Sequence, residues 1–113
     1  MSNVVMTGGG ALTSFAAGNV YQVPQADAGG GDITAVAIDL NGGTLVGATF
    51  KCRVANSGLA LTACQGVRRS DGIATAAADT SDVFMFDTTG IELWIDVPAN
   101  SGSPRGAWGY GLG

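Results

Sequence analysis

The groups in this chain that could carry out acid–base chemistry are carboxylates, because the sequence contains no His. The densest group in sequence consists of Asp71, Asp79, Asp82 and Asp87. Two carboxylates across a cleft could hydrolyse a glycoside, and the oxygens of residues 79–82 could bind a hard cation such as calcium. The spacing of a twelve-residue calcium loop is missing, and Asp at a turn commonly accepts hydrogen bonds from backbone N–H groups. We therefore predict no catalytic, cofactor-binding or metal-binding residue.

The other reactive groups are the thiols of Cys52 and Cys64. A two-residue turn at Ser57 and Gly58 would pair the strands on either side and place the two thiols on opposite faces of the sheet. This arrangement predicts free thiols, with Cys52 buried, because a disulfide needs both side chains on one face. Two cysteines without a histidine do not supply the ligands of a zinc site.

Aromatic side chains are the third candidate for function. Trp94 stands between Glu92 and Asp96 on the expected polar face of a strand. An outward Trp beside carboxylates can hold a sugar ring, anchor a protein interface, or pack within its own domain with its N–H hydrogen-bonded. The C-terminal segment alternates Gly or Ala with large side chains, namely Trp108, Tyr110 and Leu112. Its small-residue face would allow a neighbouring subunit to approach closely.

The composition restricts the kind of partner. Charged residues make up 12% of the 113 residues and the net charge is −4, whereas about 25% charged residues is usual. Nucleic-acid binding normally requires a basic surface, and we expect the basic pair Arg68 and Arg69 to meet acidic groups. Residues 1–7 lack the pattern of a signal peptide, and no stretch reaches the roughly 20 apolar residues of a membrane span. We predict protein partners, without nucleic acid or membrane, and synthesis in a host cytoplasm.

Several segments alternate apolar and polar residues with a period of two, as strands with one buried face do. The clearest is 91–97, which Pro98 terminates. The other expected strands are 20–23, 32–40, 45–54, 59–67 and 83–86, the last of them apolar on both faces like a central strand. Residues 11–17 and 74–78 are candidates for short helical turns. The pattern predicts an all-β fold, a small antiparallel β-sandwich or barrel of jelly-roll type.

The N-terminal third differs in composition, with Gly triplets at 8–10 and 29–31. A Gly-rich segment loses much conformational entropy on folding and is ordered mainly by packing on something else. Residues 1–31 therefore form either an extended arm or a set of edge strands. We predict a partner-binding arm over 1–31 and an antiparallel β domain over 32–113. The expected partner-binding residues are Val4, Val5, Leu12, Phe15, Trp94, Trp108, Tyr110 and Leu112.

The chain combines a Met1-Ser2-Asn3 start, a Gly-, Ala- and Thr-rich segment through Gly31, short strands, and almost no Lys, Glu or His. This profile resembles small bacteriophage virion proteins, namely capsid decoration (cement) proteins and tail-associated subunits. The resemblance implies an all-β homo-oligomer, often a trimer, that contacts the major capsid protein and reinforces an icosahedral shell. We therefore expect a non-enzymatic structural protein of the virion. The alternative is a carbohydrate-binding or host-attachment module that uses Trp94, Asp96 and Tyr110.

Overall fold

The computed structural model describes residues 2–24 and 33–111. The secondary-structure elements of these residues are all strands, and none is a helix. The strands are β1 (Ser2–Val5), β2 (Thr13–Ser14), β3 (Asn19–Val23), β4 (Ile33–Asp39), β5 (Thr49–Val54), β6 (Thr62–Ala63), β7 (Gly66–Arg68), β8 (Ala74–Thr75), β9 (Asp82–Asp87), β10 (Ile91–Val97) and β11 (Arg105–Gly111). The all-β class predicted from the alternating pattern is confirmed. The strands expected at 20–23, 32–40, 83–86 and 91–97 correspond to β3, β4, β9 and β10.

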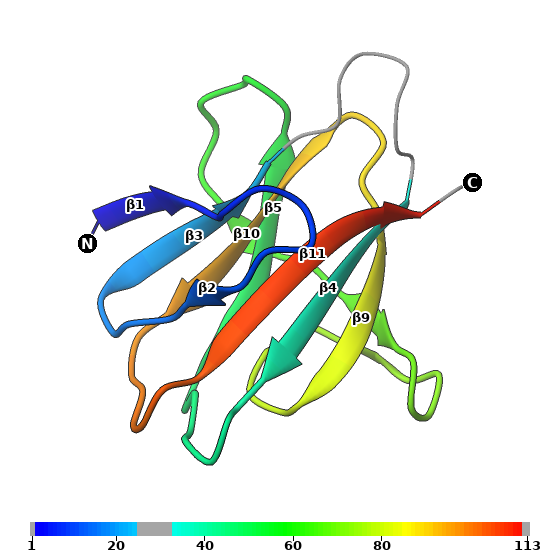
Figure 1. The fold of residues 1–113 in the computed structure, drawn as a ribbon. Coiled ribbons are helices and arrows are strands. Elements are labelled where there is room, and N and C mark those ends of the chain that lie inside the picture. Colours follow the sequence, from blue (N-terminus) through cyan, green and yellow to red (C-terminus); the bar gives the residue numbers. More distant parts are fainter. Residues whose placement is uncertain (1, 25–32, 112–113) are drawn as a thin grey trace.

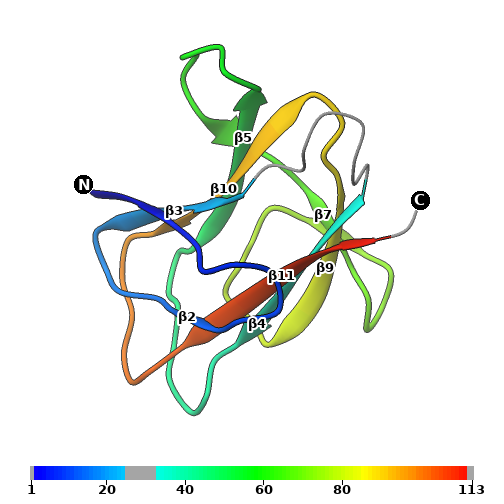
Figure 2. The ribbon, with the colours of Figure 1, turned by 45° about the horizontal axis from the view of Figure 1, so that its top comes forward.

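The strands form two sheets that pack face to face. Sheet A has the order β1-β3-β10-β5-β6, and sheet B has the order β2-β11-β4-β9-β7-β8. Paired strands are antiparallel, except that β1 runs parallel to β3. In Figure 1 the long strands β3, β10 and β5 form one layer and β11, β4 and β9 form the other. Figure 2 shows the same two layers from a second direction. The architecture is a small antiparallel β-sandwich.

Alternate residues of the long strands fill the space between the sheets. The ring of Phe50 from sheet A lies 4.8 Å from the ring of Phe84 and 4.7 Å from the ring of Phe86, both on sheet B. Ile95 and Val36 are completely buried on the same two inner faces. Every second residue of β10 and of β9 points between the sheets, and these side chains form one continuous apolar core.

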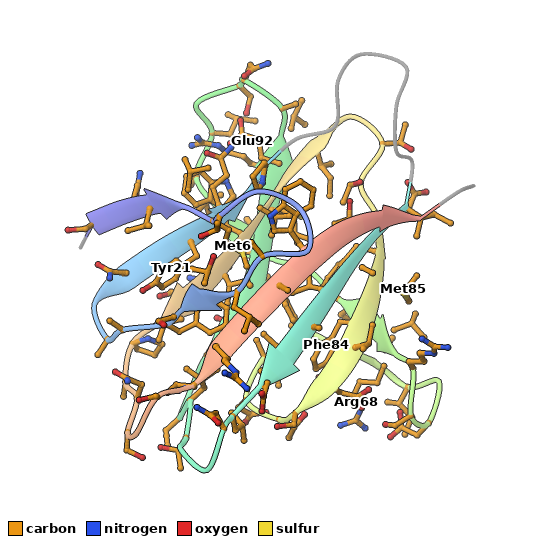
Figure 3. The ribbon with its side chains drawn as sticks, in the orientation of Figure 1. Met6, Tyr21, Arg68, Phe84, Met85 and Glu92 are labelled. Atoms are coloured by element: carbon orange, nitrogen blue, oxygen red, sulfur yellow. The ribbon has the colours of Figure 1, made fainter. Side chains whose placement is uncertain are left out.

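The N-terminal residues form part of this core instead of a separate arm. Residues 2–23 contribute β1 and β3 to sheet A and β2 to sheet B, and the segment between β1 and β2 crosses from one sheet to the other (Figures 1 and 2). Met6, Phe15 and Tyr21 are each 3% exposed. Figure 3 shows Met6 and Tyr21 close together between the layers. The predicted arm is thus wrong for residues 2–23, where the alternative of edge strands holds, and residues 25–31 lie outside the described residues.

The two predicted helical turns are also strands. Residues 11–17 contain β2, which pairs with Arg105 and Gly106 of β11, and residues 74–78 contain β8, which pairs with β7. Segments of five to seven residues are too short to form a stable helix alone. Hydrogen bonding to a neighbouring strand therefore decides their conformation.

The hairpin that carries the two thiols has a different register from the predicted one. Cys52 lies opposite Thr62, and the N–H of Cys64 donates to the carbonyl oxygen of Phe50 at 3.0 Å. This pairing is shifted by one residue, because a loop over 55–61 replaces the expected two-residue turn, and it puts both thiols on the same face. Both cysteines are free, as predicted, although Cys52 is half-buried and not buried. Burial, together with a hydrogen bond to Cys52, raises the pKa of Cys64 to about 12.

Candidate functional surface

The outer face of sheet A is closed by a network of charged side chains centred on Glu92. This residue is 3% exposed, and its Oε1 accepts hydrogen bonds from Nε of Arg53 at 2.9 Å and from Nε1 of Trp94 at 3.1 Å. Its Oε2 accepts from the N–H of Asn56 at 2.7 Å. Burial acts to raise the pKa of Glu92, but the hydrogen bonds from Asn56, Arg53 and Trp94 outweigh it, so the pKa lies below its usual value. We name Arg53, Glu92 and Trp94 the Glu92 network.

Trp94 belongs to this network and is not an exposed aromatic. Its side chain is 5% exposed, and the guanidinium carbon of Arg53 lies 5.6 Å from the ring centroid, within the range of a cation–π contact. Of the three roles considered for Trp94, the structure agrees with packing inside its own domain. The carbohydrate alternative loses its principal stacking surface, because a buried ring cannot lie flat against a sugar.

A second ion pair extends the covered area of sheet A toward the other end of β10. Nζ of Lys51 lies 3.1 Å from Oδ2 of Asp96, and Val20, directly opposite Asp96 on β3, is 5% exposed. Long polar side chains and their apolar stems thus cover the outer face of the central strand. The cover extends over the central strand β10, whereas Val5 on the edge strand β1 of the same face is 63% exposed.

The outer face of sheet B has the opposite character. Val36, Ile38, Phe84, Phe86 and Trp108 point into the core, so the residues between them point outward. These outward residues are Ile33, Ala35 and Ala37 on β4, Val83 and Met85 on β9, Ala107 and Gly109 on β11, Val67 on β7 and Ala74 on β8. None of them carries a charge, and we name the set the uncharged face. Figure 3 shows Phe84 and Met85 on opposite sides of β9.

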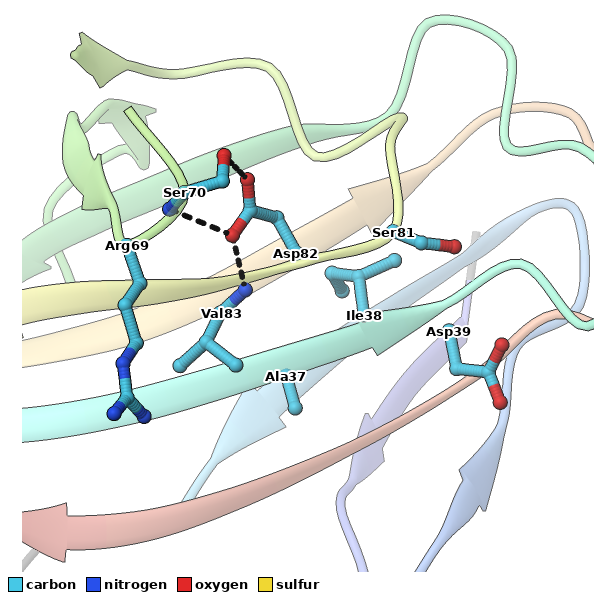
Figure 4. Close-up of a pocket in the computed structure, with 8 residues that line it drawn as sticks. All are labelled: Ala37, Ile38, Asp39, Arg69, Ser70, Ser81, Asp82 and Val83. Carbon is cyan, nitrogen blue, oxygen red and sulfur yellow. Dashed lines mark hydrogen bonds between the residues drawn. The ribbon is translucent and has the colours of Figure 1, made fainter. Parts of the chain in front are cut away.

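Charged residues are found at the two ends of the uncharged face. At one end Nε of Arg105 donates to Oδ2 of Asp39 at 3.0 Å, and this contact is the main reason that the pKa of Asp39 is lowered. Arg69 lies at the same end beside Val83, along a shallow depression of about 450 Å³ that Figure 4 shows in close-up. At the other end Asp87 lies opposite Ile33.

The residues predicted to bind a partner are distributed between the core and the surface. Phe15, Trp94 and Trp108 are buried, at 3%, 5% and 8% exposure, so these three predictions are wrong for the folded chain. Val4 packs against the core, whereas Val5 and Leu12 are exposed. The Nε1 atom of Trp108 donates to the carbonyl oxygen of Thr7 at 2.7 Å, which ties the N-terminal segment to β11. The side chain of Tyr110 and residue Leu112 lie outside the described part of the chain.

Two of the carboxylates considered for catalysis or calcium binding, Asp71 and Asp82, form hydrogen bonds and an ion pair within their own turns. Asp82 accepts hydrogen bonds from the N–H and hydroxyl of Ser70 and from the N–H of Val83, and the Ser70 hydroxyl is the main cause of its lowered pKa (Figure 4). Asp71 forms an ion pair with Arg68 at 2.7 Å. Within residues 2–24 and 33–111, no cluster of three or more His, Cys, Asp or Glu is arranged to hold a metal ion.

The sequence indicates only part of the uncharged face. The alternation over 32–40 places Ile33, Ala35, Ala37 and Asp39 together on one side of a strand, but the local pattern does not show which strands lie beside it. Comparison with protein-family models, with curated proteins and with solved structures finds no match to this chain. The described residues include no helix that is both long enough and apolar enough to cross a membrane. Fold and surface together define a β-sandwich with one charged and one uncharged outer face.

Proposed function

We propose that this chain is a non-enzymatic structural subunit of a virion, and in particular a capsid decoration or cement protein that strengthens an icosahedral shell. The observation that carries the proposal is the uncharged face, which spans β4, β7, β8, β9 and β11 and has charged side chains only at its two ends, where Asp39, Arg105 and Asp87 lie. Contiguous apolar surface on a soluble domain marks an interaction site. A subunit of this kind acts by burying such surface against its neighbours, at about 25 cal/mol per Å² of apolar area.

Two further features support an assembly role. The charged residues are few, and Arg53 and Glu92 are used inside the Glu92 network, so little charge is left to keep neighbouring molecules apart. Apolar side chains outside the uncharged face, among them Val5 at 63% and Leu12 at 55% exposure, offer additional contact area near the N-terminal segment. Many copies of a small contact give strong total stabilisation on a shell with repeated sites.

The experiment compares shells with and without the recombinant chain. Particles from the source material are purified, the chain is identified in them by mass spectrometry, and shells stripped of it are incubated with the wild-type chain or with Ala35→Glu. Val46→Glu is the matched control, because Val46 is 65% exposed outside the uncharged face and the variant changes the charge by the same amount. We expect wild type and Val46→Glu to co-sediment with shells and raise their disruption temperature, and Ala35→Glu to do neither. If the chain accompanies no particle, the proposed function is wrong.

A deletion of residues 2–17 is not a suitable test of partner binding. Met6 and Phe15 belong to the core cluster, and Phe15 packs edge-on against Tyr21 at 5.0 Å between ring centroids. Removing them would cost several kcal/mol of folding free energy, at about 3–5 kcal/mol for a buried Phe alone. Point substitutions on the uncharged face separate binding from folding.

A further inference from the structure

The centre of the uncharged face is one straight row of small and apolar side chains. Register places Gly109, Ala35, Met85, Val67 and Ala74 side by side across five neighbouring strands. No long or charged side chain interrupts this row, so a second flat surface could approach along its whole width. Two β-sheets pack in this manner in sandwiches, with side chains of both faces in contact about 10 Å apart.

Arg69 and Asp87 carry opposite charges at opposite ends of this face. Arg69 lies at the end formed by the start of β9, and Asp87 at the end formed by the finish of β9. Neither forms an ion pair within the described residues, whereas Arg105 and Asp39 form a pair with each other. The carboxylate of Asp82, in the same depression as Arg69, accepts hydrogen bonds from Ser70 and Val83, and Asp87 accepts one from the N–H of Thr89. Arg69 and Asp87 are therefore a cation and an anion at opposite ends of the face that a second molecule could pair.

We propose that the uncharged face packs against the same face of a second copy of this chain, related by a twofold axis that runs across the strands. Such an axis places each end of one face over the opposite end of the other, so that Arg69 of each copy meets Asp87 of its partner. The two ion pairs are identical by symmetry, as a self-complementary interface requires. The inference rests on the proposed function, because it takes this face as an interface, and it adds which molecule occupies it.

The size of the face sets the expected strength. The five strands lie about 4.8 Å apart and rise roughly 3.3 Å per residue; β4, β9 and β11 have six or seven residues and β7 and β8 have three and two, so the face covers roughly 400 Å² on each copy. The total of roughly 800 Å² is below the range of stable, specific protein interfaces and within that of weak, transient ones. We therefore expect a weak dimer, with a dissociation constant on the order of 10–100 µM, which crowding of many copies on one particle would favour.

The experiment measures self-association of the purified full chain by sedimentation equilibrium from about 10 µM to 1 mM. We expect a monomer–dimer equilibrium that Ala35→Glu weakens at least 100-fold and that Val46→Glu leaves unchanged. Arg69→Asp or Asp87→Arg alone should weaken the dimer about tenfold, since each creates two like-charge contacts. The double variant Arg69→Asp/Asp87→Arg should restore affinity to within about threefold of wild type. Circular dichroism spectra and urea midpoints establish that each variant is folded.

Three outcomes would overturn the inference. A monomer at 1 mM, a trimer or dimer that Ala35→Glu leaves intact, or single charge reversals that the double variant does not rescue would each exclude this interface. If the chain stays monomeric while Ala35→Glu still abolishes binding to shells, another protein occupies the uncharged face. In that case the second copy is wrong and the proposed function stands, so the two failures can be told apart.

Discussion

The two outer faces of the sandwich arise from the same strand alternation but carry opposite kinds of side chain. On sheet A the outward residues of β10 and β5 include Glu92, Trp94 and Arg53, which bond to one another and are largely buried. On sheet B the outward residues of β4 include Ala35 and Ala37, which have no polar atoms beyond the backbone. On the first face the side chains of β5 and β10 cover the centre of the sheet, and the second face has no such cover of charged side chains at its centre, which is why we propose it as the binding surface.

Although the chain contains few charged residues, one of them, Glu92, is buried on the outer face of sheet A. A buried carboxylate is tolerated only when charged partners and hydrogen bonds replace its water. The guanidinium of Arg53 and the indole N–H of Trp94 in the Glu92 network, together with the backbone N–H of Asn56, serve that purpose. We therefore expect sheet A's face to be sensitive to substitution for reasons of folding, and the uncharged face to be sensitive for reasons of binding.

The largest expected effect is that of Trp94→Ala. The change removes a side chain that is 5% exposed and leaves a cavity under Arg53. Truncation of a buried Trp costs about 3–5 kcal/mol of the free energy of unfolding. Urea denaturation followed by circular dichroism measures the loss.

Met85→Ala on the uncharged face is the comparison variant, and we expect a loss of about 1 kcal/mol or less because Met85 is only half-buried. Equal losses at the two positions would contradict the contrast between the faces.

The next effect in size is that of Glu92→Ala. This change leaves Nε of Arg53, Nε1 of Trp94 and the N–H of Asn56 without their carboxylate acceptor. Removing one partner from a buried ion pair costs about 3 kcal/mol or more, and we expect a loss of that order in urea unfolding.

The matched variant on the other face is Asp39→Ala, which breaks the exposed pair with Arg105. In that pair the Arg105 side chain is 40% exposed and the Asp39 side chain is 51% exposed. The expected loss for this variant is small, because solvent screens an exposed pair. A loss for Glu92→Ala as small as that of Asp39→Ala would show that the network adds little.

The sequence predicted the alternation of the long strands well, because one buried face imposes a two-residue period on β4 and β10. It could not predict the Glu92 network, since Arg53 and Glu92 are 39 residues apart and meet only when β5 pairs with β10. Glu92 and Asp96 therefore looked like solvent-exposed carboxylates. The same reason hid the uncharged face, which exists only once β4, β9 and β11 lie next to one another.

The errors at the N-terminus and at the thiols have a common physical origin. A glycine-rich composition indicates high conformational entropy in the unfolded chain. It does not show whether burial of side chains such as Phe15 and Tyr21 stabilises the folded segment enough to offset the loss of that entropy. At the thiols the predicted two-residue turn set the register, and the actual loop over 55–61 shifts it by one residue. Since the side-chain period of a strand is two, that shift moved Cys64 to the face of Cys52.

A smaller difference between the faces should appear as pH dependence. Burial opposes the ionised form of Glu92, but its hydrogen bonds from Asn56, Arg53 and Trp94 prevail and lower its pKa, while the Arg105 guanidinium lowers the pKa of Asp39. A lowered folded-state pKa gives stability that is present above the unfolded value of about 4 and is lost as the pH falls through the folded value. We expect the free energy of unfolding to be level from about pH 7 to 5 and to fall below about pH 4.

Two variants assign this acid loss to one face or the other. Glu92→Gln should flatten the pH profile in 0.5 M salt, because a buried pair is screened little, whereas Asp39→Asn should have almost no effect there. The measurement is urea unfolding at several pH values between 3 and 7. If Asp39→Asn flattens the profile more than Glu92→Gln, the acid sensitivity belongs to the exposed pair and the assignment to sheet A is wrong.

The smallest expected effect is that of Gly109→Ala on β11. A Cβ at Gly109 would meet no atom of the described residues within 4 Å, because Gly109 is on the uncharged face. Alanine loses less conformational entropy than glycine on folding, so the free energy of unfolding should stay the same or rise by up to about 0.5–1 kcal/mol. Gly106, on the inner side of the same strand, is the contrasting position, because its Cβ would lie 2.6 Å from the ring of Phe15 and 2.9 Å from the carbonyl oxygen of Ala37. Urea unfolding of both variants tests which side of β11 is occupied, and a loss above about 1 kcal/mol for Gly109→Ala would mean that the uncharged face is already covered by this chain.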